Sequence, residues 1–226
     1  WAIGFFLIGI TSFALCAGTL QRRLLVLIMV SLWSLRLMGF YIKRMMSGQE
    51  EGRFQAVQEW FQVKWFQAAS QLKLLLLFFL QGLFIMVISW PIVLMSANID
   101  ATTSTLEWVG FALWLACFIG ESIADSQLLK FRSRIENRFK VCNEGLWSLS
   151  RHPNYFFEFG IWIAFALMAF TAPFGFTAIV SPIAMWYLLM KAPGLDAYEA
   201  HALKIKGAVY EEYQRKTNRF IPWFPK

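Results

Sequence analysis

Long apolar runs recur along the chain, separated by shorter polar segments. Most of them approach or exceed the roughly 20 residues that an α-helix needs to cross a hydrocarbon core. Apolar residues follow one another without regular alternation, which favours helices over the strands of a membrane barrel. We therefore predict an all-α, polytopic integral membrane bundle of about six transmembrane helices. The six runs are residues 2–19, 24–42, 72–97, 106–126, 155–171 and 176–192.

Local signals refine this pattern. Pro91 falls late in the third run, and we expect it to kink that helix because proline removes a backbone donor and clashes with the preceding turn. Residues 50–70 mix aromatic and charged side chains, as in an amphipathic helix on a membrane surface. The C-terminal stretch is typical of a polar helix that ends near Thr217, followed by an extended finish.

The composition agrees with a membrane protein. Of the 226 residues, 58% are hydrophobic and only 15% are charged, whereas soluble domains average near a quarter charged. We treat residues 1–226 as a single membrane domain and expect a monomer. The chain opens on Trp1, against an apolar run, so we expect a further segment before it and seven helices in the intact protein.

Basic residues lie mostly on one side of the predicted membrane. That side carries 18 Lys and Arg residues, whereas the other carries only Arg22 and Arg23. The positive-inside rule makes the richer side cytoplasmic, and we expect a cytoplasmic C-terminus. The net charge of +7 is then a topology signal, and it does not point to nucleic acid. The cytoplasmic segments are 43–71, 127–154 and 193–226, with the flanking Lys73 and Lys191.

Cysteine and histidine usage excludes two classes of site. The three cysteines, at positions 16, 117 and 142, suggest neither a disulfide framework nor a Cys-rich metal site. Two histidines, His152 and His201, are too few for a His-based metal cluster. We predict no metal.

Two acids stand at the cytoplasmic end of the fourth run. Glu121 and Asp125 are four residues apart, a spacing that puts both side chains on one helical face. Acids in membrane helices are costly and usually face a cavity or a partner. The alternative is an ordinary helix end in which these acids pair with Lys130 and Arg132.

A second polar group opens the fifth run. In "SRHPNYFFE", Arg151, Tyr155 and Glu158 share a helical face, and Asn154 lies beside them. Pro153 is a natural first-turn residue, so the preceding backbone N–H groups can face an anion. The alternative is a capped helix end with an Arg151–Glu158 ion pair.

Further basic residues have two interpretations. The loop between these helices supplies several Arg and Lys side chains, and Arg grips phosphate with two hydrogen bonds. The same residues equally suit anionic lipids. In the second run, Arg36 lies deep enough to require a partner. The loop residues are Lys130, Arg132, Arg134, Arg138 and Lys140.

These motifs together resemble the C-terminal domain of the steroid 5-alpha-reductase family, in its bacterial branch. The resemblance covers most of residues 32–224 and rests on A-D-x-Q, G-L-W-x-x-S-R-H-P-N-Y-x-x-E and Y-x-x-Y-x-x-x-T. The R-H-P-x-Y piece also occurs in membrane isoprenylcysteine carboxyl methyltransferases and sterol reductases. The combination is more specific than any one piece.

The resemblance implies a membrane reductase that transfers hydride from NADPH to the C=C bond of a lipophilic 3-oxo-Δ4-steroid-like enone taken from the bilayer. It also implies a bacterial inner membrane protein whose cytoplasmic loops close over the cofactor. Substrate-side candidates are Trp33, Glu121 and Tyr155. This sequence has Phe139 and Trp33 where the family has tyrosines, and we expect the acid that polarises the substrate ketone to lie upstream of the second run. The cofactor contacts implied by the resemblance are Arg36, Arg44, Asp125, Arg132, Lys140, Arg151, His152, Asn154 and Glu158.

Two other function classes fit parts of the sequence. The shared R-H-P-x-Y piece suits an S-adenosylmethionine-dependent lipid or isoprenylcysteine methyltransferase, although A-D-x-Q and the acid at Glu158 favour the reductase. A non-enzymatic membrane scaffold or transporter would account for charges within the membrane with no cofactor.

Overall fold

Helices make up the regular structure of the described chain. The computed structural model describes residues 1–46, 71–137, 140–191 and 194–224, and in these ranges there is no strand, only an isolated bridge between Ser150 and Asn218. The all-helical prediction is confirmed for this part of the chain, whereas the predicted surface helix at 50–70 lies outside it. The elements are α1 (Ala2–Leu15), α2 (Leu20–Met46), α4 (Gln71–Ile88), α5 (Trp90–Ala97), α6 (Thr105–Arg132), η1 (Ile135–Asn137), α7 (Leu146–Leu149), α8 (Pro153–Ala169), η2 (Gly175–Ile179), α9 (Val180–Met190), α10 (Gly194–Lys206) and α11 (Ala208–Lys216).

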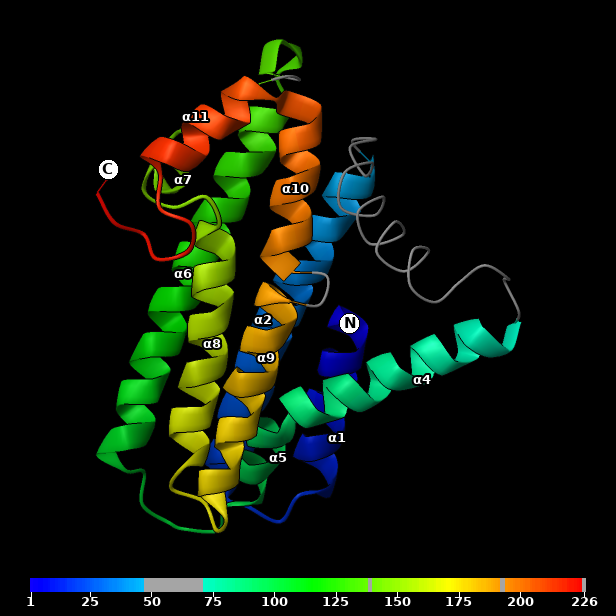
Figure 1. The fold of residues 1–226 in the computed structure, drawn as a ribbon. Helices are drawn as coiled ribbons and strands as arrows, with labels where there is room; N and C mark the ends of the chain where they lie inside the picture. The colour runs from blue at the N-terminus through cyan, green and yellow to red at the C-terminus, as the bar shows by residue number, and fades with distance from the viewer. Residues whose placement is uncertain (47–70, 138–139, 192–193, 225–226) are drawn as a thin grey trace. The chain divides into compact units, whose positions relative to one another are not determined.

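Within the described ranges, three stretches are long and apolar enough to cross a membrane, namely Leu20–Lys43, Thr105–Arg132 and Gly175–Lys206. A fourth is added if Phe78–Ile88 and Trp90–Ala97 form one span, since they meet at a bend of 44° (Figure 1). The bend falls just before Pro91, in the first turn of α5, so the predicted kink is confirmed.

The described residues do not support the predicted count of six spans. The 14 residues of α1 extend about 21 Å and the 17 residues of α8 about 26 Å at 1.5 Å per residue, short of a hydrocarbon core about 30 Å thick. Other helices extend beyond the apolar runs predicted from the sequence. In particular, α6 continues to Arg132, so Lys130 and Arg132 belong to a helix and not to the predicted loop.

The chain divides into two compact units. The first comprises Trp1–Gly39, Gln67–Ala116 and Gly160–Trp186, and the second comprises Phe40–Phe66, Cys117–Phe159 and Tyr187–Lys226.

Aromatic side chains from three helices form the core of the first unit. Phe5 of α1, Trp33 of α2 and Trp162 of α8 are each at most 1% exposed. The Trp33 ring meets the Phe5 ring edge to face at a centroid distance of 5.1 Å and the Trp162 ring at 5.4 Å. Such pairs contribute about 0.5–1.5 kcal/mol each beyond the area that they bury.

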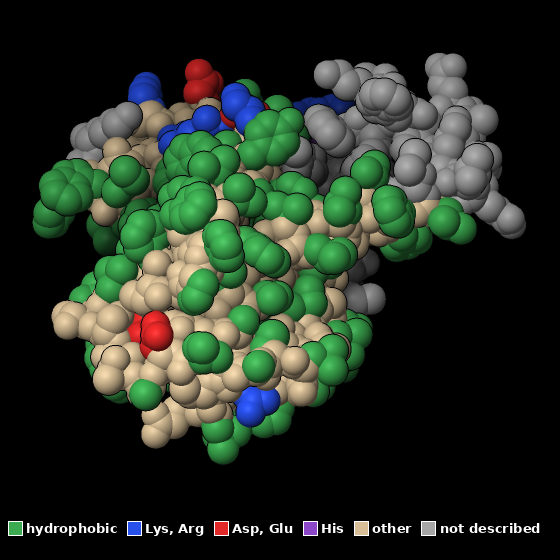
Figure 2. All heavy atoms as spheres, turned by 90° about the horizontal axis from the view of Figure 1, so that it is seen from below, with side chains coloured by type: hydrophobic (Ala, Val, Ile, Leu, Met, Phe, Trp, Pro, Cys, Tyr) green, Lys and Arg blue, Asp and Glu red, His purple; other side chains and the backbone are tan. Residues whose placement is uncertain are grey.

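A buried arginine closes one end of the first unit. Arg22 holds Glu107 through Nε–Oε1 at 2.6 Å and Nη2–Oε2 at 3.1 Å, and it also donates to the carbonyls of Asp100 and Thr102. Glu107 and Ser104 exchange backbone-to-side-chain hydrogen bonds, the capping box that starts a helix. Hydrophobic and uncharged side chains dominate this end of the unit in Figure 2.

The second unit packs around Trp147. Its indole N–H donates to the Ala124 carbonyl of α6 at 2.9 Å, and its ring clusters with Leu128, Phe131 and Cys142. Helix α11 follows α10 after Gly207, whose φ of +53° belongs to the left-handed region. The chain then folds back along α7, as Figure 1 shows. The predicted end of the C-terminal helix near Thr217 is confirmed, because α11 ends at Lys216 with Thr217 as its cap.

Candidate functional site

The candidate site is built in the second unit around the segment that precedes α8. Arg151 is buried and binds Glu199 of α10 with two hydrogen bonds, Nε–Oε1 at 2.8 Å and Nη2–Oε2 at 3.1 Å. Its Nη1 donates to the carbonyls of Gln214 and Thr217 at 3.0 and 2.8 Å. Four of its five N–H donors are therefore engaged within the protein. The ion pair of Arg151 is with Glu199, whereas the alternative interpretation of the sequence paired it with Glu158.

His152 continues this network. Its Nε2 lies 3.0 Å from Oε1 of Glu199, and the His152 side chain is buried. Burial lowers the pKa of His152, because the hydrogen bond to Glu199, which favours the charged ring, does not outweigh desolvation and the nearby Arg151 and Arg219 charges. His152 is therefore a neutral imidazole. Glu199 determines its tautomer, because the carboxylate accepts a hydrogen bond from the proton on Nε2.

Two tyrosines flank the imidazole. The Tyr155 ring is stacked on the His152 ring at a centroid distance of 5.7 Å, and the Tyr198 ring meets it nearly edge to face at 5.4 Å. Tyr198 also accepts a hydrogen bond at its hydroxyl oxygen from Nη2 of Arg132 at 3.2 Å. The structure thus brings together three predicted site residues, Arg132, His152 and Tyr155, around a tyrosine of α10.

Helices α6 and α8 contribute a second polar contact. The Asn154 amide donates to Oδ1 of Asp125 over 3.4 Å, a long hydrogen bond. The helices approach closely here, because a Cβ on Gly120 would lie 2.5 Å from the Phe157 ring. Glu121, buried like Asp125, is one turn before it, and half-buried Glu158 is one turn after Asn154. These two polar faces meet at the Asp125–Asn154 contact.

The C-terminal segment holds the start of α8 in place. Ser150 donates its hydroxyl to the Phe220 carbonyl at 2.8 Å and accepts the His152 N–H at 3.1 Å. The Arg151 N–H donates to the Asn218 carbonyl at 2.8 Å, and the Trp223 N–H donates to the Leu149 carbonyl at 3.1 Å. This segment therefore pairs with residues 149–152 and orients the residues that follow them.

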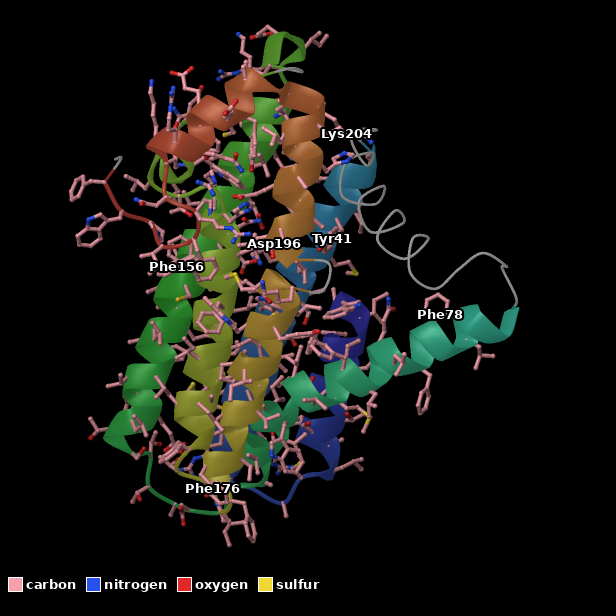
Figure 3. All side chains as sticks on the ribbon, viewed as in Figure 1. Tyr41, Phe78, Phe156, Phe176, Asp196 and Lys204 are labelled. Carbon is pink, nitrogen blue, oxygen red and sulfur yellow. The ribbon has the colours of Figure 1, made fainter. Side chains whose placement is uncertain are left out.

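Aromatic contacts add to these hydrogen bonds. The Phe220 ring meets the Phe156 ring at 5.7 Å and the Phe159 ring at 6.2 Å, and Figure 3 labels Phe156 near the start of α8. Tyr213 donates its hydroxyl proton to the Trp147 carbonyl. Burial raises the pKa of Tyr213 well above its usual range, so this hydroxyl remains a donor.

The substrate-side candidate Trp33 and the other predicted cofactor residues lie outside these contacts. Trp33 and Arg36 belong to the first unit, where Trp33 is part of the aromatic core and Arg36 is half-buried. Arg44 is near the end of α2, and its side chain is outside the described atoms. Lys140 is exposed, and its carbonyl accepts a hydrogen bond from Nζ of Lys206 at 2.7 Å. Phe139 is outside the described residues.

Two residues of α10 were not predicted from the sequence. Glu199 binds both Arg151 and His152, and Tyr198 joins Arg132 to His152. The available signal was Glu199, with Tyr198 directly before it, in the polar helix that follows the last apolar run. Figure 3 labels Asp196 and Lys204 on this helix.

A polar cleft lies beside α10. It is lined by Arg151, Asp196, Glu199, Ala200, Leu203, Gln214 and Arg219.

Comparison with known proteins places the chain in a family. Its residues 1–217 match the family model described as "Protein of unknown function (DUF1295)". Searches of the curated proteins and of the solved structures found no match. Because the family model spans nearly the whole chain, the protein belongs to the DUF1295 family.

Proposed function

We propose that the protein is a membrane reductase that uses NADPH to saturate the C=C bond of a lipophilic enone, such as a 3-oxo-Δ4-steroid. The observation that carries the proposal is the Asp125–Asn154 contact between α6 and α8, with the buried carboxylate of Glu121 one turn away. Polar groups of this kind in apolar helices are costly. A polar cofactor, bound where a hydrophobic substrate enters the protein, would account for these polar groups.

The residues present fit the nicotinamide end of NADPH. The Asn154 side chain is half-buried, and among the described residues only its amide nitrogen makes a hydrogen bond. Its carbonyl oxygen is therefore available to accept an N–H from a carboxamide. Asp125 would hold the Asn154 amide in that orientation, and Glu158 would lie one turn further along the same helix.

Cationic groups at the end of α6 fit the phosphates. Arg132 is half-buried and interacts electrostatically with Lys206 of α10, so like charges converge where an anion would relieve their repulsion. The backbone carbonyl of exposed Lys140 accepts a hydrogen bond from Nζ of the same Lys206. Arg151 and His152 would contribute to cofactor binding only indirectly, because their polar groups already bind Glu199 and the C-terminal segment.

The chemistry requires stabilisation of charge on an oxygen. NADPH, when bound, supplies a hydride to the β-carbon of the enone. The C=C electron pair then shifts toward the carbonyl, whose oxygen becomes an enolate, and a proton from water reaches the α-carbon to complete the reduction. The protein's tasks are to orient the enone, to exclude water from the hydride and to place a hydrogen-bond donor at the enolate oxygen.

The proposal includes the membrane arrangement predicted from the sequence. Six spans in a bacterial inner membrane would place the α6–α8 polar residues and the C-terminus on the cytoplasmic side. A cysteine introduced at exposed Lys204, in a chain with its native cysteines replaced by serine, should react with a membrane-impermeant maleimide only after the cytoplasmic side is opened. Labelling from the outer side of intact cells would reject this orientation.

Ligand-dependent thermal stability tests the cofactor. The detergent-purified protein should be stabilised by NADPH, by about 2.7 kcal/mol at 100 times the dissociation constant. NADH and S-adenosylmethionine serve as comparisons. Stabilisation by S-adenosylmethionine alone would support a methyltransferase instead, and no response to any of the three would support a scaffold or transporter.

Variants then locate the cofactor. Asn154→Ala and Glu158→Ala should weaken NADPH binding at least tenfold without lowering the melting temperature of the apoprotein by more than a few degrees. Glu211→Ala removes the same side chain from an exposed position of α11 and should leave NADPH binding unchanged. If both site variants bind NADPH as the wild type does, the assigned position is wrong.

A further inference from the structure

A groove of about 430 Å³ lies along the exposed side of α6, from Phe118 to Lys130. Its lining includes Ile119 and Ile123, which are 49% and 45% exposed, whereas Asp125, which contacts α8, is buried. Every residue that lines the groove belongs to α6. The groove therefore lies outside the proposed cofactor site, and a ligand can approach it from the side.

Two serines line the groove without leaving a hydroxyl donor unused. The Ser122 hydroxyl donates to the Phe118 carbonyl at 2.6 Å, and the Ser126 hydroxyl donates to the Ser122 carbonyl at 2.7 Å. Each donor is thus satisfied within the helix, and these small side chains leave space beside the larger isoleucines. An acyl chain can fill that space, because it takes no hydrogen-bond partner away from the serines.

The length of the groove matches one leaflet of a bilayer. Glu107 and Lys130 lie near the two ends of α6, about 35 Å apart at 1.5 Å per residue, which is enough to bracket a hydrocarbon core about 30 Å thick. Phe118 is midway between them, so the groove extends about 18 Å from the middle of that core to Lys130. A lipid with its acyl chain in the groove would therefore place its headgroup beside Lys130.

Hydrogen-bond donors lie at this end of the groove. The Leu146 backbone N–H donates to Oε1 of Gln127 at 3.0 Å, so the two N–H groups of the Gln127 amide are directed elsewhere. Among the described residues these N–H groups have no acceptor, and the exposed Lys130 ammonium has no acidic partner. Since no acid is among the residues that line the groove, its polar end suits an anion with several acceptor oxygens, such as a phosphate diester.

A second copy of the chain fits the groove less well than a lipid does. Two copies inserted in the same direction would be related by a two-fold axis, and contact through this groove would bring the two Lys130 side chains together. Like charges repel more strongly near hydrocarbon than in water, and the residues lining the groove include no acid to offset that repulsion. The phosphate of a lipid would neutralise Lys130 instead.

We propose that the groove binds one anionic glycerophospholipid, with an acyl chain along residues 118–126 and the phosphate held by Lys130 and the Gln127 amide. The site requires α6 to lie in the bilayer, but it is independent of the cofactor and of the reductase function. A headgroup with net negative charge is favoured over a zwitterionic one, because Lys130 repels a choline ammonium.

Native mass spectrometry of the delipidated, detergent-purified protein tests the site. The probes are dioleoylphosphatidylglycerol and dioleoylphosphatidylcholine, which carry the same acyl chains. The wild type should bind one phosphatidylglycerol about fivefold more tightly than phosphatidylcholine, as expected for one lysine at an anionic headgroup. Lys130→Gln should bind the two lipids equally. Lys204→Gln, at an exposed position of α10, should retain the preference.

A second variant tests the groove itself. Ser126→Phe fills the groove and leaves Lys130 in place, so it should weaken the binding of both lipids by about tenfold or more. Ile183→Phe, at an exposed position of α9, should bind both as the wild type does. Equal affinity of the wild type for the two lipids overturns the proposal, and so does a preference retained in Lys130→Gln. A lipid-free dimer that Ser126→Phe dissociates would assign the groove to a second copy and also overturns it.

Photo-crosslinking keeps the test valid if a variant does not fold. Phosphatidylglycerol with a diazirine in one acyl chain is bound to the wild type and irradiated, and the modified residues are identified by peptide sequencing. The label should lie within residues 118–126. A label confined to other helices overturns the proposal.

Discussion

Arg151 holds both carboxylate oxygens of Glu199 across 48 positions of sequence, at 2.8 and 3.1 Å. The pair joins the segment before α8 to α10, and the remaining donors of Arg151 reach the end of α11. Because the same carboxylate also binds His152, one acid organises the start of the candidate site.

We expect Glu199→Ala to be strongly destabilising. Removing one partner of a buried pair leaves the other charge without compensation, which costs about 3–5 kcal/mol. The measurement is chemical denaturation of the purified protein. Asp196→Ala provides the matched control, because Asp196 pairs with Arg219 and with Lys191 on an exposed surface, and exposed pairs contribute about 0–1 kcal/mol. Equal losses for the two variants would contradict a dominant role for the Arg151–Glu199 pair.

The lowered pKa of His152 predicts a dependence of stability on pH. Below pH 6.5 the unfolded chain binds a proton at this residue that the folded protein takes up only at lower pH. The free energy of unfolding should therefore fall as the pH decreases from about 6.5 toward the folded-state pKa, and it should be constant with respect to this group above about pH 7.5.

The comparison of two histidine variants isolates this contribution. His152→Gln retains a donor toward Glu199 but does not titrate, so its melting temperature should fall less between pH 7.5 and 5.5 than that of the wild type. His201→Gln changes the other histidine of the chain and should retain the full decrease. The same pH profile in the wild type and His152→Gln would show that another group is responsible.

Local signals in the sequence were sufficient for the helices and some of their ends. Pro91 marks the bend between α4 and α5, and Pro153 begins α8 as expected of a first-turn proline. The spacing of four between Glu121 and Asp125 placed both on one face of α6, and that face reaches Asn154. Each of these inferences depends on residues within one or two helical turns.

The partners of the buried charges could not be predicted in this way. Helical spacing relates residues three or four apart, so it drew attention to Glu158 as the partner of Arg151 and gave no reason to choose Glu199. Similarly, Arg22 was counted as a charge that sets topology, although it is buried against Glu107. Such pairings depend on how distant helices fold together, which hydrophobic patterns do not record.

Arg22 offers a second test of buried ion pairing. Arg22→Lys retains the charge, but a single ammonium cannot reproduce the two-point contact with Glu107 together with the carbonyls of Asp100 and Thr102. We expect a loss of about 2–4 kcal/mol in the free energy of unfolding, measured by denaturation. Arg215→Lys, on the exposed face of α11, should change it by less than about 0.5 kcal/mol. If Arg22→Lys left the free energy of unfolding unchanged, the positive charge alone would be sufficient to stabilise this pair.

Gly120→Ala tests whether the distance between α6 and α8 matters for the proposed cofactor. The new methyl group would lie 2.5–2.7 Å from three atoms of the Phe157 ring, so the ring or the helix must shift, at a cost of about 1–3 kcal/mol. Because Asp125 and Asn154 are already 3.4 Å apart, any separation of the helices breaks their contact.

We therefore expect Gly120→Ala to weaken NADPH binding at least tenfold in addition to lowering the melting temperature. Gly39→Ala is the matched control, since nothing lies within 4 Å of its added Cβ and alanine favours a helix by about 1 kcal/mol. That variant should bind NADPH as the wild type does. Because a general loss of stability would also reduce the fraction of folded protein, affinity is measured well below the melting temperature of each variant. Gly120→Ala with unchanged affinity would place the cofactor away from the α6–α8 contact.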